Sequence, residues 1–454
     1  MVLLFGGEFR AFSQASLTTI LANGPVSNRL NVVVLSEGYT SAQLGTFLSQ
    51  ATNLSSALFS QPPFQEYQRY FNAFAISVPS NQSGSDHPNG PTFRDTYFNS
   101  TYDSLSDYII TIPPNSADTN YSHGQGKIDS LLQTFMPNCQ LPVLLVNDLT
   151  PGGSDGFGKA AITYQGISSV QILSHESGHV LANLGDEYTV PFPGFPDTEE
   201  PNTTRETRPD FIKWKAWIDT NSTPIPTPPT AQYSSVVGLF QGAHYHVTNW
   251  YRPKLNCTMN SPEAPFCDVC SEALVLAIYK FVAPVDAFLP SNTNLSVSTT
   301  ASLQFSLNLL QPSTHNVEVQ WSTNAIPVPG ATNTGFVVSP QTLGNGTHVV
   351  RASVTDNPPL VRNDPNHLLN QNIEWTLNIN VPQLQLDSAV MLPAGRFAFR
   401  INGTAPQGFS IRGSSNLLDW TALITNSLVG GHFWYTNSNS INSPSYFFRA
   451  VTPP

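Results

Sequence analysis

The sequence predicts a multidomain protein, in which an α/β (α+β) domain is followed by one or two all-β sandwich modules. Two observations support this. Strand-like apolar runs and helical patterns alternate up to about residue 284, and after Pro284 and Pro290 short alternating segments separated by Pro, Gly and Asn replace them. A chain of 454 residues, of which 40% are hydrophobic, is long enough for two to four domains with ordinary cores.

We expect the first domain to span residues 21–284, after an N-terminal arm or signal-peptide remnant at residues 1–20. Its strands are predicted by short apolar runs, at Leu30–Leu35, Phe74–Val78 and Leu141–Val146. Its helices are predicted by apolar residues at helical spacing, at Gln43–Phe59, Ile128–Phe135, Ser271–Phe281 and the segment between Ser168 and Gly185. Ser168 is a good N-cap, and Gly185 suits a left-handed turn at the end of that helix.

The remaining chain predicts a β-sandwich at residues 285–382 and a second β module at residues 383–454. Strands of the first are expected within Ser296–Leu307, Asn316–Ser322 and His348–Thr355. Strands of the second are expected at Phe397–Ile401, Phe409–Gly413, Gly431–Thr436 and Tyr446–Val451.

The composition indicates an extracellular protein. Charged residues make up only 11% of the chain, whereas Pro (38 residues), Asn, Ser and Thr are plentiful, which is common in secreted β-rich proteins. We therefore expect a protein that is secreted, extracellular or periplasmic. The formal net charge of −11 argues against a nucleic-acid partner. We expect no transmembrane segment, because the longest apolar candidate, Ala273–Tyr279, is too short to span a bilayer.

The motif His175-Glu176-Ser177-Gly178-His179 has the HExxH spacing of a catalytic zinc site. Residues four apart lie on one face of a helix, so both imidazoles can bind one Zn²⁺ ion. Glu176 lies beside that ion, where its carboxylate can take a proton from a zinc-bound water. An isolated HExxH also arises by chance in helices, so the prediction needs support from the rest of the chain.

The third ligand is predicted just after the helix. A left-handed turn at Gly185 returns the chain toward the metal, so that Asp186 or Glu187 can bind it. Both acids remain candidates on this argument.

Four cysteines lie at positions 139, 257, 267 and 270. The Cys267-x-x-Cys270 spacing is compatible with a structural zinc, to which Cys257 and Cys139 can add ligands, with a redox pair or with a disulfide. Because the chain has the composition of a secreted protein, we favour disulfides, with the pairing open.

The sequence resembles the immunoglobulin A peptidase family of secreted bacterial zinc metallopeptidases over about residues 28–275. The motifs that carry the resemblance occur in the family's order, at Leu30–Thr40, at Ser83–Pro88 with Asp95-Thr96, at His175–Tyr188, and at Gly238–Met259 with Phe266–Cys270. The resemblance implies a metzincin-like catalytic domain, one catalytic zinc and hydrolysis of peptide bonds. It implies His175 and His179 as ligands, Glu176 as the base and Met259 as the Met-turn methionine.

The chain departs from the usual metzincin pattern at two positions. Ala182 replaces the glycine seven residues after the first histidine, and Gly185 stands where the third ligand is usual. The third ligand is therefore shifted by one or two positions. Asp186 is nearer the expected register and slightly favoured, while Glu187 has the longer reach.

The proposed chemistry needs a second donor, besides the zinc, for the oxyanion of the tetrahedral intermediate. Tyr245 is the first candidate, followed by His246, Tyr251 and Tyr188. Asp86 and His87, in a Gly/Ser/Pro-rich loop, are a candidate Ca²⁺ site or part of the substrate cleft.

The expected function is a secreted zinc-dependent endopeptidase acting on a protein or peptide substrate. The C-terminal modules resemble immunoglobulin-like and other β modules of secreted enzymes, which suggests binding to a glycan or a cell surface, with a spacer role as the alternative. The alternative function is a non-catalytic surface binding or adhesion protein that keeps the zinc fold as a scaffold. The intact Glu176 favours the enzyme, because a scaffold needs no general base.

Overall fold

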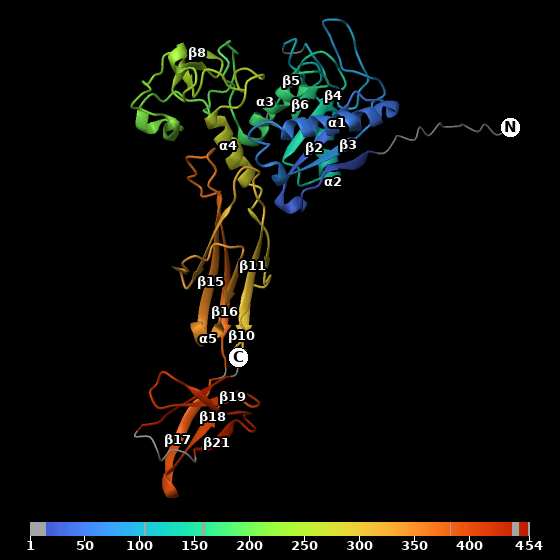
Figure 1. Cartoon of the computed structure of the whole chain (residues 1–454). Helices are drawn as coiled ribbons and strands as arrows, with labels where there is room; N and C mark the ends of the chain where they lie inside the picture. The colour runs from blue at the N-terminus through green and yellow to red at the C-terminus, as the bar shows by residue number, and fades with distance from the viewer. Residues whose placement is uncertain (1–14, 104–105, 157–158, 382, 438–444, 453–454) are drawn as a thin grey trace, which may run out of the picture. The chain divides into compact units, whose positions relative to one another are not determined.

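The computed structural model describes residues 15–103, 106–156, 159–381, 383–437 and 445–452 (Figure 1). These residues fold into two compact units. The first contains the described chain up to Asp286 together with Leu310–Glu318 and Thr355–Gln371, and the second contains the rest. Within the described ranges, no helix is both long and apolar enough to cross a membrane.

A six-stranded sheet forms the centre of the first unit, in the order β1-β3-β2-β4-β6-β5. Its strands are β1 (Ser16–Leu21), β2 (Leu30–Glu37), β3 (Phe71–Ser77), β4 (Leu141–Val146), β5 (Gly153–Ser154) and β6 (Ala161–Tyr164). The four inner strands β3, β2, β4 and β6 are parallel, and the two edge strands run antiparallel to their neighbours. Every residue of these inner strands is buried, which explains why they were predictable as continuous apolar runs.

Helices cover both faces of this sheet. They are α1 (Leu44–Phe59), α2 (Gln125–Phe135), α3 (Ser169–Ala182) and α4 (Asp268–Tyr279). Alternate β2 residues point to opposite faces: Val32 and Val34 share a core with α1, α3 and α4, whereas Val33 and Leu35 share one with α2. The mixed α/β character predicted for this part of the chain is confirmed.

The HExxH helix ends earlier than predicted. α3 stops at Ala182, and Asn183 takes the left-handed conformation with φ of 50°. The turn therefore depends on an asparagine, which tolerates this backbone, and not on Gly185.

Between α3 and α4 the chain has little regular structure. Its one strand pair is the hairpin of β7 (Phe240–Ala243) and β8 (His246–Arg252). The two turn residues, His244 and Tyr245, both have positive φ values of 55° and 60°, as a two-residue hairpin turn requires. The hairpin thus presents Tyr245 at its tip.

Among its described residues, the second unit is all-β apart from the short helix α5 (Pro340–Leu343) and a 3₁₀ turn at Pro393–Gly395. One pair of sheets contains the strands β9 (Val285–Leu289), β10 (Asn294–Val297), β11 (Leu303–Leu309), β12 (Glu318–Thr323), β13 (Ile326–Pro327), β14 (Gly335–Val338), β15 (Gly346–Thr355) and β16 (Asn370–Ile379). Phe305 of β11 packs on Trp321 and Trp375 of the opposite sheet, with ring centroids 6.2 and 5.0 Å apart. These contacts define a β-sandwich.

A further pair of three-stranded sheets follows. Its strands are β17 (Gln385–Leu392), β18 (Arg396–Asn402), β19 (Gly408–Ser414), β20 (Thr421–Ser427), β21 (His432–Asn437) and β22 (Phe447–Val451). Phe399 of β18 contacts Phe448 of β22 at 5.2 Å, and Phe409 of β19 contacts Phe433 of β21 at 5.0 Å. The two sheets therefore enclose a small aromatic core.

Glu37, at the end of β2, fixes the loop that follows β3. Its fully buried carboxylate accepts hydrogen bonds from Thr96 Oγ1 (2.6 Å), Ser100 N (2.8 Å) and Phe98 N (2.9 Å). Gly84 N of the same loop donates to Gly38 O at 3.1 Å, so the Leu30–Thr40 and Ser83–Pro88 motifs lie side by side.

We predict that Glu37→Ala lowers the free energy of unfolding by about 3 kcal/mol or more, because three buried donors lose their acceptor at about 1–3 kcal/mol each. Urea denaturation measures this. Asn53→Ala, on the exposed side of α1, is the matched control and should stay within about 0.5 kcal/mol of the parent. Equal midpoints for the two variants would contradict this role of Glu37.

Candidate active site

The two histidines of the motif converge from adjacent turns of α3. Their Nε2 atoms lie 3.1 Å apart. His175 Nδ1 lies 2.9 Å from Thr258 O, and His179 Nδ1 lies 2.6 Å from Leu184 O. A carbonyl only accepts, so each Nδ1 carries the hydrogen, and in the neutral ring the Nε2 lone pair is free for a metal.

Asp186 completes this group. Its Oδ1 lies 3.2 Å from His175 Nε2 and 3.5 Å from His179 Nε2, and although buried it accepts no hydrogen bond. Its Oδ2 accepts a hydrogen bond from the Tyr245 hydroxyl. These three residues form one of two groups of metal-binding side chains found in the described chain.

The geometry of this group fits a zinc ion. Two nitrogens bound to tetrahedral zinc lie about 3.3 Å apart, close to the 3.1 Å between His175 Nε2 and His179 Nε2. Two facing lone pairs and an unpaired carboxylate oxygen also repel one another unless positive charge lies between them. The residues present therefore suit a divalent cation.

The electrostatics of the site agree with this. Burial disfavours the charged form of His179, but the Asp186 carboxylate outweighs burial and raises the pKa of His179 to about 10. Without an ion the ring therefore binds a proton, and a metal ion has to displace this proton to reach the Nε2 lone pair. Burial also disfavours the charged form of Asp186, and the nearby His179 outweighs it and lowers the pKa of Asp186 below its ordinary value. The carboxylate thus stays ionised and attracts positive charge to this point.

Glu176 lines the same cavity as the three ligand residues, but its pKa shifts in the opposite direction to that of Asp186. Burial raises the pKa of Glu176 to about 7, although His175 and His179 oppose the shift. A carboxylate whose pKa is near the working pH is suited to accept and return a proton.

The site opens into a cavity of about 1190 Å³. His175, Glu176, His179, Asp186 and Tyr245 all line it. Other parts of its wall come from the segments Tyr108–Pro114, Pro151–Gly156 and Phe192–Pro196. A volume of this size can hold several residues of a peptide in contact with Glu176.

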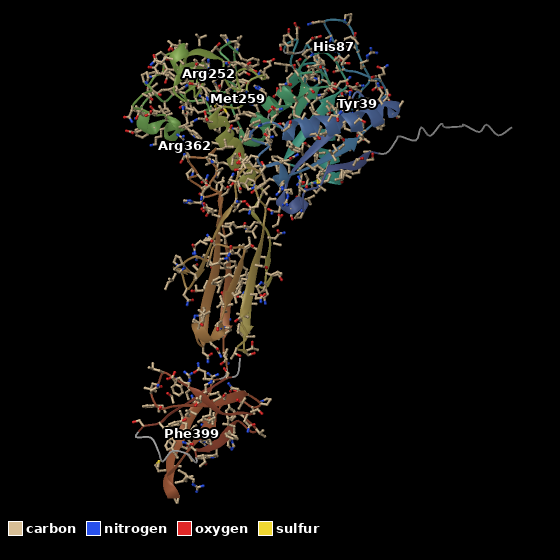
Figure 2. The ribbon with its side chains drawn as sticks, viewed as in Figure 1. Tyr39, His87, Arg252, Met259, Arg362 and Phe399 are labelled. Atoms are coloured by element: carbon tan, nitrogen blue, oxygen red, sulfur yellow. The ribbon has the colours of Figure 1, made fainter. Side chains whose placement is uncertain are left out.

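Met259 lies in the segment that joins β8 to α4 (Figure 2), and it packs against α3. A Cβ atom at Gly178 would lie only 3.0 Å from Met259 Sδ, so the glycine of the motif permits the close approach. Met259 is fully buried, and its neighbour Thr258 accepts the bond from His175. This position is compatible with the predicted Met-turn role.

Glu187 does not face the histidines. Its carboxylate belongs to the second group of metal-binding side chains, with Cys257, Cys267 and Cys270. Asp186 and Glu187 were alternatives for the third ligand beside the histidines. In the structure Asp186 faces the histidines and Glu187 faces the cysteines.

The expectation of disulfides is wrong for this structure, in which all four cysteines are free. Cys257 Sγ and Cys270 Sγ lie 3.6 Å apart, well beyond a disulfide bond of about 2.05 Å. Cys139 packs in the core on the α2 side of the sheet, whereas Cys257 belongs to the core on the α3 side.

The three other candidate donors and His244, which lies in the hairpin turn, have different surroundings. Tyr188 lines the cavity with Tyr245 and stacks on His175 at 5.9 Å. Tyr251 and His246 are not among the lining residues. His244 is fully buried, stacked on Trp250 at 3.8 Å and 3.1 Å from Glu200 Oε1.

The suggested calcium site gains no support. His87 Nε2 lies 2.9 Å from Asp148 Oδ2, and Asp86 Oδ1 accepts a bond from Arg94 N at 2.6 Å. Neither residue belongs to a metal-binding group within the described ranges. Calcium needs six to eight oxygen ligands.

Asn202 is a site residue that sequence reasoning missed. It is fully buried, bonds both Gly185 N (2.7 Å) and Gly185 O (2.9 Å), and donates to Glu187 Oε1 at 3.0 Å. It therefore holds the backbone of Gly185, which precedes Asp186, and the side chain of Glu187, which follows it. An asparagine in a loop rich in Pro, Asn and Thr carries no local signal of this role.

Comparison with protein families identifies a peptidase. The model of the family described as IgA peptidase M64 matches residues 18–232 and 229–278. These matches cover more than half of the chain, so the chain belongs to the IgA peptidase M64 family. No curated protein sequence matches it.

Similarity to solved structures is weak. A chain of "Chaperone-tip adhesin complex is vital for synergistic activation of CFA/I fimbriae biogenesis" is 11% identical, covers 37% of this chain and 92% of its own length, and has a TM-score of 0.14. The apo structure of Bacteroides uniformis beta-glucuronidase 3 is 9% identical, with 45% and 28% covered and a TM-score of 0.15. Such low TM-scores support no argument about this chain.

We predict that Asn202→Ala lowers the free energy of unfolding by about 2 kcal/mol or more, because Gly185 loses the partners of both its backbone groups. Denaturant unfolding at fixed zinc concentration measures this, with the exposed loop variant Asn221→Ala as control. If both variants unfold at the parent's midpoint, the turn is held by other contacts.

Proposed function

We propose that this protein is a secreted zinc-dependent endopeptidase that cleaves peptide bonds of extracellular proteins. His175, His179 and Asp186 are its metal ligands, and Glu176 is its general base. The observation that carries the proposal is the convergence of three ligand atoms beside a buried carboxylate at the wall of a large cavity.

The three protein ligands leave one coordination position of the zinc open. Two imidazoles and one carboxylate give zinc three protein ligands, and catalytic zinc sites keep their fourth position open. When bound, zinc would polarise the substrate carbonyl and lower the pKa of the attacking water. The cavity beside Asp186 and Glu176 gives a substrate access to this position.

Glu176 moves the proton in this proposal. Its carboxylate accepts the proton of the attacking water and then gives it to the amine of the leaving peptide. Its pKa of about 7, set by burial, favours both steps near neutral pH.

Tyr245 is proposed as the second donor to the oxyanion. Its hydroxyl lies at the ligand group and its side chain lines the cavity. Burial, and next the Asp186 carboxylate, raise the pKa of Tyr245 above its ordinary value, so the hydroxyl keeps its proton and can donate it in a hydrogen bond.

The composition supports secretion, and the cavity supports cleavage within a chain. With a volume of about 1190 Å³, the cavity can enclose an extended peptide on both sides of the cleaved bond. The C-terminal sheets are proposed to bind a glycan or cell surface.

We predict that Glu176→Gln lowers kcat for a generic protein substrate at least about 10²–10⁴-fold while zinc content stays at the parent level. Gln keeps the shape of the side chain and removes only its basicity. Casein cleavage and metal analysis of the same preparation measure the two effects. Unchanged cleavage with zinc retained would reject the peptidase proposal and favour a binding protein built on the zinc fold.

We predict that Tyr245→Phe lowers kcat about 10²–10³-fold, with little change in KM or in zinc content, because it removes one hydrogen bond made to the transition state. Tyr188→Phe, on the same cavity wall, is the control and should retain most activity. A loss of zinc affinity together with a normal kcat at saturating zinc would instead make Tyr245 a positioning residue for Asp186.

A further inference from the structure

A second group of metal-binding side chains lies outside the cavity. Glu187, Cys257, Cys267 and Cys270 are all buried, and one ligand atom from each lies within 4.8 Å of every other. None of the four residues lines the cavity of the proposed active site. The family's peptidase activity gives this group no role.

The spacing of these atoms matches a tetrahedral metal site. Two sulfurs bound to zinc at about 2.3 Å lie about 3.8 Å apart, and a sulfur and an oxygen lie about 3.5 Å apart. Cys257 Sγ and Cys270 Sγ are 3.6 Å apart, and Cys270 Sγ lies 3.8 Å from Glu187 Oε1. A disulfide between any two of these cysteines would leave the third thiol outside the bond and would give Glu187 Oε2 no partner.

An independent observation points to a missing ligand. Glu187 is fully buried, and its Oε2 accepts no hydrogen bond from any described residue. Its other oxygen is held by Asn202 Nδ2 at 3.0 Å, which fixes the direction of the carboxylate. A buried carboxylate oxygen without a partner is costly unless a cation binds it.

Burial raises the pKa of Cys257 and of Cys270, so these two thiols lose their protons only when a cation binds. Nearby groups would then stabilise the thiolates. The backbone N–H of Cys267 points to Cys257 Sγ at 3.3 Å. Cys267 is the N-cap of α4 and Cys270 lies in its first turn, where the helix dipole stabilises negative charge. Arg252 adds a nearby cation, since its Nη1 donates to Glu187 O at 3.3 Å.

We propose that Glu187, Cys257, Cys267 and Cys270 bind a second zinc ion with a structural role. Four protein ligands without access to the cavity leave no open position, and this is how structural zinc sites differ from catalytic ones. The site binds together three parts of the chain: the segment after α3, the Met259 segment and the start of α4.

This site supports the active site through its neighbours. Glu187 follows Asp186 directly in the chain, and its backbone N–H donates to Met259 O at 2.9 Å. Fixing Glu187 and Cys257 therefore also fixes the turn that presents Asp186 and the segment whose Thr258 holds His175. The inference rests on its own ligands and does not require the proposed function.

The first test counts metal ions. Zinc analysis of the purified full chain should find about two ions per chain. The variant His175→Ala with His179→Ala should keep one, and Cys267→Ser with Cys270→Ser should lose the structural ion. Cys139→Ser, which changes a thiol on the other side of the sheet, should keep both. One ion in the parent chain and none in the histidine variant would overturn the proposal.

The second test identifies the sulfur ligands and does not depend on folding of the cysteine variant. Co²⁺ loaded into the histidine variant should give the sulfur-to-metal charge-transfer absorption of a thiolate site. Absence of this band, or a mass that shows the loss of two hydrogens in a disulfide among these cysteines, would reject the site. If the band persists while Glu176→Gln leaves cleavage unchanged, the proposed function fails and this site stands.

Discussion

The functional part of the structure depends on the short segment Asp186–Tyr188, which is held by backbone hydrogen bonds on both sides. Glu187 N donates to Met259 O, Asp186 O accepts from His244 N, and Tyr188 O accepts from Tyr245 N. In an extended chain, successive side chains point in opposite directions. Asp186 therefore faces the histidines and Glu187 faces the cysteines, and a shift of one residue would exchange the two acids.

Much of the catalytic domain could be predicted from the sequence, because the signals are local. Strand β4 occupies the predicted residues Leu141–Val146, and β2 extends the predicted run by two residues. The pairing of His175 with His179 follows from helical spacing alone. The order of strands in the sheet could not be predicted in this way, since it depends on which apolar faces pack together.

The conformation of the residues after α3 could not be predicted from the sequence. Gly185 was expected to make the left-handed turn, yet Asn183 makes it. The last turn of α3 closes through backbone bonds from Asn183 N to His179 O (3.0 Å) and from Leu184 N to Gly178 O (3.2 Å). After this turn, Gly185 is held by Asn202 and the backbone of Glu187 by Met259 O, and neither partner is a near neighbour in the sequence. Local propensity contains no information on such contacts.

The buried cysteines bear on what stabilises the segment between α3 and α4. The long segment between α3 and α4 forms one short hairpin, so few ladder hydrogen bonds hold it. In such a segment, buried polar residues and metal ligands replace the sheet as the source of order. Composition alone favoured disulfides, but a disulfide joins only two points of the chain, whereas a four-ligand metal site fixes three segments at once. If the proposed second zinc is present, the position of Asp186 depends on residues outside the cavity, because Glu187 is its neighbour in the chain and one of the four proposed ligands.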